Sequence, residues 1–317
     1  MDPYKSLNII LNPNNTLTRL NEAPQIPPSP NPTSFPNIPV LFKDLTIDPS
    51  KPTWTRIYLP LHHSHHHKLP IIVFFHGGGF IFDSAASPYH HNFCAKVSNF
   101  TNSVVVSIDY RLAPEHRLPA AYDDSVEALH WIKATNDLWL TRHADYSRCY
   151  LMGESAGGNI VYNVGLRAAA EFDHHDHIHV RPLKITSLVM IHPFFGGTKR
   201  TASELRLEQN TTLPVAITDM LWNLSLPVGA NRDHKYSNPM IHGGSKGLDR
   251  MRELGWRVAV FGSYGDPLVD HQRQFVNFLK GKGVHVVAQF SPGGRHGIFI
   301  ENPSLANKVY DFIRSLH

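Results

Sequence analysis

The sequence predicts an α/β protein whose central sheet is mostly parallel and carries helices on both faces. Apolar runs rich in β-branched residues recur along the chain, as at 71–75 and 103–109, and such runs are typical of buried strands. Helical stretches separate these runs, and strands that alternate with helices favour parallel pairing. The 317 residues, 42% of them hydrophobic, are enough for one large domain with a lid or for two small domains.

The expected strands and helices alternate along most of the chain. We expect strands over residues 53–59, 69–75, 103–109, 149–152, 183–191, 256–262 and 284–290. We expect helices over residues 119–133, 155–171, 269–281 and 303–315. This order predicts a single α/β domain that spans residues 1–317.

Two segments depart from the alternation. Residues 24–39 hold seven prolines, which exclude a regular helix or a central strand. We therefore expect an N-terminal cap segment, residues 1–40, that runs extended into the core. Residues 198–245 are expected to form two short helices and loops, and this insertion is the candidate lid.

A Gly-x-Ser-x-Gly run, Gly153-Glu-Ser-Ala-Gly157, lies between an expected strand and an expected helix. Glycine two residues to either side of the serine permits a tight turn that lifts the hydroxyl above the sheet. The apolar run 149–152 precedes the turn, and a helical pattern follows from 159 to 170. Ser155 is therefore the candidate nucleophile.

A glycine-rich loop, His76-Gly-Gly-Gly-Phe80, directly follows the apolar strand 71–75. An acyl-transfer enzyme must stabilise the oxyanion that forms when its nucleophile attacks, and backbone N–H groups of such a loop can do so. The predicted oxyanion hole consists of the N–H groups of Gly78, Gly79 and Ala156.

Five motifs resemble those of the plant carboxylesterases of the hormone-sensitive-lipase group, over most of the chain. They are His76-Gly-Gly-Gly-Phe80, Asp109-Tyr-Arg-Leu-Ala-Pro-Glu-His116, Gly153-Glu-Ser-Ala-Gly-Gly-Asn159, Gly262-Ser-Tyr-Gly-Asp-Pro-Leu-Val-Asp270 and Gly293-Gly-Arg-His-Gly297. The resemblance implies an α/β-hydrolase fold with a helical cap, a Ser-Asp-His triad and activity on small or short-chain carboxylic esters.

The remaining triad members are sought after the serine, since this fold places the acid and then the histidine on loops that follow strands. His296 follows the strand 284–290 and is flanked by glycines. Asp266 follows the strand 256–262, but an Asp before Pro at a helix start is also a good N-cap. Asp270 is the alternative acid, and the resemblance favours Asp266.

Charged clusters near these motifs have a supporting role in this interpretation. We expect 109–111 and 115–117 to form a buried polar network that braces the oxyanion loop. Glu154, next to the nucleophile, is expected to support the catalytic residues by contact rather than to act as a base.

Composition excludes several other classes of protein. The net charge is +4, without a basic run that carries interleaved aromatics, so no nucleic-acid partner is expected. The two cysteines give no disulfide framework, and Cys149 is expected in a core strand. No secretory signal or apolar run of membrane-spanning length is visible, which predicts a cytoplasmic protein.

Two histidine-rich runs, at 62–67 and 174–179, could suggest a metal. Zinc requires three or four converging ligands with tetrahedral geometry, which loop histidines do not supply by themselves. We therefore expect neither a metal nor a cofactor.

The predicted function is hydrolysis of a small-molecule ester through an acyl-enzyme, by a protein expected to be a monomer. The family resemblance leaves three alternatives. One is a non-catalytic receptor like the gibberellin receptors, which lack the catalytic histidine. The others are a dehydratase or cyclase of plant metabolism and a slow hydrolase that binds a hormone such as a strigolactone.

The apolar N-terminal residues have no core of their own, so we expect them to pack against the lid and roof the acyl pocket. These residues are Leu7, Ile9, Ile10 and Leu11. Their expected partners are Leu205, Leu207, Leu221, Trp222 and Leu224.

Overall fold

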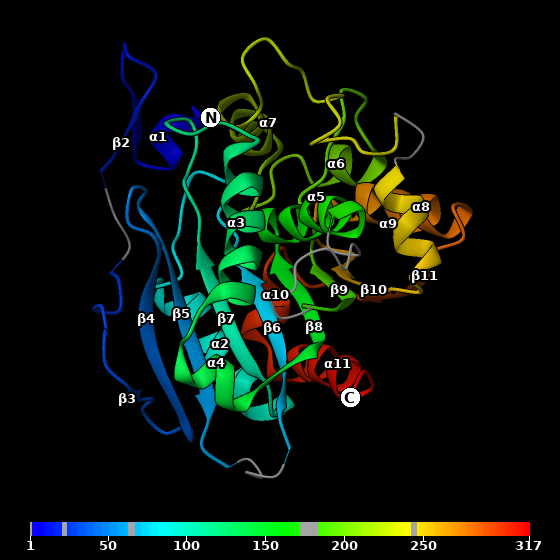
Figure 1. Cartoon of the computed structure of the whole chain (residues 1–317). Helices are drawn as coiled ribbons and strands as arrows, with labels where there is room; N and C mark the ends of the chain where they lie inside the picture. The colour runs from blue at the N-terminus through cyan, green and yellow to red at the C-terminus, as the bar shows by residue number, and fades with distance from the viewer. Residues whose placement is uncertain (1, 21–23, 63–66, 172–182, 242–245) are drawn as a thin grey trace.

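A nine-stranded sheet forms the centre of the computed structural model, which describes residues 2–20, 24–62, 67–171, 183–241 and 246–317 (Figure 1). The strands lie in the order β11 (His285–Ser291), β10 (Arg257–Ser263), β9 (Ile185–Ile191), β8 (Ala144–Glu154), β6 (Leu69–Phe75), β7 (Val104–Asp109), β5 (Thr53–Pro60), β4 (Val40–Asp48) and β3 (Thr33–Ser34). Strands β6 to β11 pair in parallel, and β5, β4 and β3 extend one edge antiparallel. The predicted α/β class with a mostly parallel sheet is confirmed.

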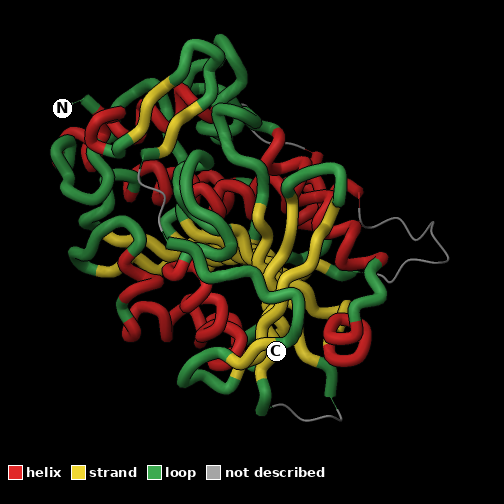
Figure 2. Tube along the Cα trace, turned by 90° about the vertical axis from the view of Figure 1, so that its left-hand side faces the viewer, coloured by secondary structure: helices red, strands yellow, loops and turns green. Residues whose placement is uncertain are grey.

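Helices cover both faces of this sheet (Figure 2). One face carries α2 (Pro88–Thr101) and α11 (Pro303–Arg314), and the other carries α3 (Ala120–Ala134), α5 (Ala156–Glu171) and α9 (Val269–Gly281). The shorter helices are α4 (Leu138–His143), α8 (Lys246–Glu253) and α10 (Ile298–Glu301).

Two hydrophobic cores result from the alternation of side chains along the strands. In β6, Ile71, Val73 and Phe75 belong to the core under α3, α5 and α9, whereas Ile72 and Phe74 belong to the core under α2 and α11. All five side chains are fully buried, because a parallel strand between two helical layers has no solvated face. The carboxyl ends of these strands form the edge on which the candidate catalytic residues lie.

Every expected strand and helix is present, but the sequence analysis missed several elements. It missed α1 (Pro3–Ser6), β1 (Ile9–Leu11), β2 (Leu17–Arg19), β3, β4, α2, α4, α8 and α10, and it placed the start of β8 five residues too late. In β4, Lys43 and Asp44 interrupt the apolar pattern because both side chains are used in ion pairs. Both cysteines, Cys94 in α2 and Cys149 in β8, are free and fully buried, as expected for Cys149.

The N-terminal segment and the 198–245 segment meet above the carboxyl edge of the sheet. The first contains α1 (Pro3–Ser6) and a hairpin of β1 (Ile9–Leu11) with β2 (Leu17–Arg19). The second contains α6 (Ala202–Arg206) and α7 (Val215–Ser225), the expected two short helices. Helix α1 contacts α7, and both lie near the N-terminus in Figure 1.

The expected burial of the N-terminal apolar residues is only partly right. Ile9 is buried and Leu7 half-buried, but Ile10 and Leu11 are 50% and 41% exposed. The hairpin lays one face on the body of the protein, so neighbouring side chains of β1 cannot all be covered. Among the expected partners, Leu205 of α6 is also exposed.

Candidate active site

Ser155 lies at a sharp turn between β8 and α5, and its backbone has a φ of +55°. This left-handed conformation is unusual for a residue with a side chain and is held by neighbouring backbone. The Ser155 N–H donates to the carbonyl of Ile191 (2.9 Å), and its carbonyl accepts from the N–H of Phe194 (2.9 Å). The turn is therefore fastened to the end of β9.

Gly157, two residues after the serine, permits the turn to press against the sheet. A Cβ atom at this position would lie 1.9 Å from the carbonyl oxygen of Phe75, at the end of β6. The Gly-x-Ser-x-Gly spacing is thus a packing requirement, because backbone cannot yield to such a contact.

Ser155, His296 and Asp266 form a continuous hydrogen-bonded chain. The Ser155 Oγ lies 2.8 Å from Nε2 of His296, and Nδ1 of the same imidazole lies 2.9 Å from Oδ2 of Asp266. Asp266 follows β10 and His296 follows β11, so adjacent parallel strands deliver both residues to the serine. All three side chains are buried. The structure brings together the three residues that the sequence indicated.

The expectation that Asp266 could be the N-cap of the helix is wrong, because the N-cap of α9 is Leu268 and no side chain caps it. Asp266 instead stabilises the preceding turn, and it uses a different oxygen for this than for His296. Oδ1 accepts the Leu268 N–H (2.9 Å), which fixes the turn that enters α9. Oδ2 faces His296 and also accepts the side-chain amide of Gln272 (2.8 Å). The turn-stabilising and imidazole-orienting roles therefore coexist rather than compete.

Asp270, the alternative acid, faces away from the imidazole. Its Oδ2 accepts the N–H of Ser203 (2.8 Å), and its Oδ1 lies 3.5 Å from Arg273. Asp270 thereby ties α6 to α9, and the structure does not bring it to His296.

The glycines expected to form the oxyanion hole also have left-handed backbones, with φ of +94° at Gly78 and +61° at Gly79. Among the described residues, none accepts a hydrogen bond from the N–H groups of Gly78, Gly79 or Ala156, which leaves these donors available to a ligand. Helix α7 closes over the loop: a Cβ atom at Gly79 would lie 2.7 Å from Leu221, and the Ser225 hydroxyl donates to the Gly79 carbonyl (3.3 Å).

Electrostatics couple the imidazole to two carboxylates. Burial works against the charged imidazolium, but Asp266 and, more weakly, Glu154 outweigh it and hold the pKa of His296 above 6.5. Burial likewise opposes ionisation of Asp266, yet the nearby His296 holds the pKa of that carboxyl below 3.8. Burial raises the pKa of Glu154, which lies 3.8 Å from Nε2 of His296. The environment therefore favours the imidazolium–carboxylate pair.

The polar network behind the oxyanion loop is centred on Tyr110. Its hydroxyl donates to the carbonyl of His76 (2.8 Å), and its ring stacks on the His76 imidazole with centroids 4.2 Å apart. Asp109 accepts the N–H of Ala85 (2.8 Å), and burial raises its pKa to about 6. Tyr110 thus braces the start of the oxyanion loop, as the sequence analysis expected, whereas Asp109 holds the segment that follows the loop.

The charged neighbours of this pair bind elsewhere, which corrects the expectation of one buried network. Arg111 pairs with Asp124 of α3 (2.7 Å). Glu115 is partly exposed and pairs with Arg19 of β2 (3.0 Å), whose Nε also donates to the carbonyl of Ile81 (2.8 Å). Arg19 thus fastens the N-terminal hairpin to the segment that follows the oxyanion glycines.

Two residues near the triad escaped the sequence analysis. The Tyr89 hydroxyl donates to the carbonyl of Gly297 (2.7 Å) and so anchors the loop that carries His296. His192 lies 3.0 Å from the Ser263 hydroxyl, with its ring centroid 5.3 Å from that of His296. His192 directly follows β9, and this position could have identified it, whereas no sequence signal marks Tyr89.

The described ranges contain neither a cluster of metal-ligating side chains nor a helix able to span a membrane. There, no three His, Cys, Asp or Glu side chains are grouped as metal ligands. Of the histidine-rich runs, 174–179 and most of 62–67 lie outside the described residues. No helix in the described part combines the length and apolar character needed to cross a membrane.

Comparison with known proteins places these features in context. Residues 72–300 match a family model described as alpha/beta hydrolase fold. The chain is 45% identical to carboxylesterase 20 of Arabidopsis thaliana over 99% of this chain and 96% of that one. It is 40% identical to a 3-O-acetylpapaveroxine carboxylesterase of Papaver somniferum, over 96% and 93%.

Among solved structures, a hyperthermophilic esterase from the archaeon Pyrobaculum calidifontis superposes with a TM-score of 0.74. The match covers 88% of this chain and 85% of that chain, at 25% identity.

Proposed function

Since this chain belongs to the plant carboxylesterases of the α/β-hydrolase fold, and is a carboxylic ester hydrolase, we propose that Ser155, His296 and Asp266 are its catalytic triad. The observation that carries the proposal is the unbroken hydrogen-bonded chain from the serine hydroxyl through the imidazole to a buried carboxylate. We propose hydrolysis of small or short-chain esters through an acyl-enzyme.

Acylation begins at the Ser155 hydroxyl. His296 Nε2 accepts the hydroxyl proton as Ser155 Oγ attacks the ester carbonyl carbon, and the carbonyl oxygen becomes an oxyanion. The N–H groups of Gly78, Gly79 and Ala156 donate to that oxygen, where charge develops. The tetrahedral intermediate then collapses, the carbon–oxygen bond to the alcohol breaks, and His296 gives its proton to the leaving alkoxide.

Deacylation repeats the cycle with water. His296 accepts a proton from a water molecule that attacks the acyl carbonyl, the same N–H groups hold the second oxyanion, and the acid leaves as Ser155 regains its proton. Asp266 keeps the Nδ1 proton of His296 in place and stabilises the imidazolium in both halves.

A short acyl group is favoured by the contact between the lid and the oxyanion loop. Leu221 of α7 lies so close to Gly79 that no Cβ atom fits between them, which limits the space beside the oxyanion position. The relative from Papaver somniferum is named for an acetyl ester, and an acetyl group is small enough for such a limited space. We therefore propose acetyl and similarly small acyl esters as substrates.

Ser155→Ala provides the central test. The variant should lose about 10⁴–10⁶-fold in kcat on 4-nitrophenyl acetate while keeping its melting temperature within a few degrees. Paraoxon should add one diethylphosphoryl group to Ser155 of the wild type, located by peptide mass spectrometry, and none to the variant. Full activity of Ser155→Ala would contradict the mechanism.

A panel of 4-nitrophenyl esters of rising acyl length tests the substrate class. We expect kcat/KM to be highest for the acetate and butyrate and to fall steeply for longer chains. The slow-hydrolase alternative predicts a different time course of nitrophenol release. One equivalent per enzyme is released in a burst, and almost no turnover follows.

A further inference from the structure

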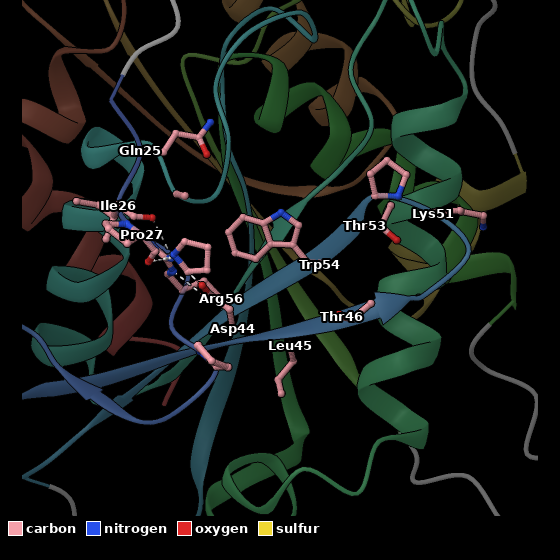
Figure 3. Close-up of a pocket in the computed structure, with 14 residues that line it drawn as sticks. Gln25, Ile26, Pro27, Asp44, Leu45, Thr46, Lys51, Thr53, Trp54 and Arg56 are labelled. Atoms are coloured by element: carbon pink, nitrogen blue, oxygen red, sulfur yellow. Dashed lines mark hydrogen bonds and ion pairs between the residues drawn. The ribbon is translucent and has the colours of Figure 1, made fainter.

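An open cavity of about 580 Å³ lies away from the catalytic triad, on the antiparallel edge of the sheet. Its walls are the proline-rich segment 24–30 and strands β4 and β5 with the turn between them (Figure 3). Its described lining includes neither the triad nor the oxyanion glycines. The volume falls within the range of pockets that hold small organic ligands, roughly 300–1,000 Å³.

Hydrogen bonds fix the proline-rich wall in place. The Ile26 N–H donates to the carbonyl of Ala86 (2.9 Å), and the Ser29 N–H donates to the Asp44 carboxylate (2.9 Å). The carbonyl of Pro27 accepts from the buried guanidinium of Arg56 (3.1 Å). Prolines stiffen this wall because their φ is fixed. The cavity is therefore preformed, and ligand binding costs little conformational entropy in the protein.

The lining offers flat apolar surface around one tryptophan. In Figure 3 the indole of Trp54 lies near the centre, with Ile26 and Pro27 to one side and Thr53 to the other. The Arg56 guanidinium stacks 5.5 Å from the centre of the Trp54 ring and helps to hold it. An indole face and proline rings are the surfaces on which planar rings pack best.

Thr53 adds little to this surface. Its side chain is 1% exposed, and its hydroxyl, which has no hydrogen-bond partner within the described residues, is covered by protein atoms and does not face the cavity. The contact surface is therefore mainly apolar, made by Trp54 and the prolines.

The charges of the lining are already paired. Arg56 forms a bidentate ion pair with Asp44, with distances of 2.6 and 2.7 Å. Lys51 lies 2.7 Å from Glu127 and 3.3 Å from Asp48. A charged ligand would have to be desolvated without gaining a free partner, and this favours a neutral one.

We propose that this cavity is a second binding site, distinct from the catalytic site, for a small neutral molecule with a flat fused ring. The ring packs on Trp54 and the prolines.

The test uses the full chain after complete reaction with paraoxon, so that the catalytic site is blocked, and 2-naphthol as the probe. Equilibrium dialysis should show about one bound 2-naphthol per chain. Trp54→Ala should weaken binding by about ten-fold or more, as loss of a tryptophan anchor does. Trp131→Ala, which removes a half-buried tryptophan of α3 outside this lining, is the control and should leave binding unchanged.

The preference for a neutral ligand provides an independent test. The paraoxon-treated wild type should bind 2-naphthoate about ten-fold more weakly than 2-naphthol, because the paired charges of the lining leave no free partner for a carboxylate. Absence of 2-naphthol binding to the paraoxon-treated enzyme, 2-naphthol binding that Trp54→Ala leaves unchanged, or equal binding of 2-naphthoate and 2-naphthol would overturn the proposal.

Discussion

The Glu154 carboxylate lies 3.8 Å from Nε2 of His296, the same ring nitrogen that contacts the Ser155 hydroxyl. Glu154 immediately precedes the nucleophile and is buried by the oxyanion loop, since a Cβ atom at Gly77 would lie 2.2 Å from its Oε2. The imidazole is thus bordered by two carboxylates, Asp266 behind it and Glu154 beside the reacting nitrogen. Glu154 therefore influences the proton affinity of His296 without a direct hydrogen bond to it.

Glu154→Gln should shift the acid limb of kcat/KM to lower pH. Activity requires the neutral imidazole, so the rate falls when the pH drops through the pKa of His296 in the free enzyme. Because Glu154 helps to raise that pKa, removing its charge lowers the pKa and extends activity into more acidic solution. Initial rates on 4-nitrophenyl acetate between pH 4 and 9 measure the shift. An unchanged acid limb would assign Glu154 a packing role alone.

The raised pKa of His296 also makes the free energy of unfolding depend on pH. Activity rises with pH through this pKa, whereas the stabilisation by His296 falls. A histidine that binds its proton more tightly when folded contributes its full stabilisation below the unfolded pKa, and this contribution disappears as the pH rises through the folded pKa. The difference in free energy of unfolding between wild type and His296→Gln should therefore shrink as the pH is raised from 5 to 9. Urea titrations across this range test the sign, and a growing difference would contradict it.

Asp266→Asn and Asp270→Asn should separate the two carboxylates. Asparagine at 266 no longer fixes the productive tautomer of His296, and kcat should fall by about 10³–10⁴-fold. Asparagine at 270 still offers an oxygen to the Ser203 N–H, so kcat should change little. If instead Asp266→Asn only lowers the melting temperature, its contact with Leu268 is what matters.

Ser155 and His296 should act as a unit. Each single alanine variant should lose about 10⁴–10⁶-fold in kcat, and the double variant should be hardly slower than either. Single-turnover rates of the three variants on 4-nitrophenyl acetate provide the comparison. Losses that multiply would mean that His296 works independently of the serine.

The N-terminal hairpin should influence substrate binding through Arg19. Arg19→Ala removes the ion pair with Glu115 and the bond to the Ile81 carbonyl, and should destabilise the protein by about 1–2 kcal/mol and raise KM. Deleting residues 1–23 should raise KM further while paraoxon still labels Ser155. Arg252→Ala, which breaks an exposed ion pair with Asp249, is the control. Equal KM values in the deletion and the wild type would exclude the hairpin from the site.

Local patterns predicted the site better than they predicted its surroundings. Ser155, Asp266 and His296 each occupy a loop after a buried strand, so chain order and glycine spacing were enough to propose them. Tyr89 was missed because its bond to Gly297 joins residues 208 positions apart, a relationship that no local pattern contains. Strand β4 was missed for a related reason, since charged side chains such as Lys43 find partners through tertiary contacts.

The two buried cysteines make this chain a convenient background for spectroscopy. Cys94 and Cys149 are fully covered and burial raises the pKa of both thiols, so neither should react with a maleimide while the protein is folded. A cysteine introduced at Leu205, which is 64% exposed on α6, would then be the one labelled position. Paired with a second label at the exposed Asp311 of α11, it would report by spin–spin distance whether α6 moves when the enzyme is acylated.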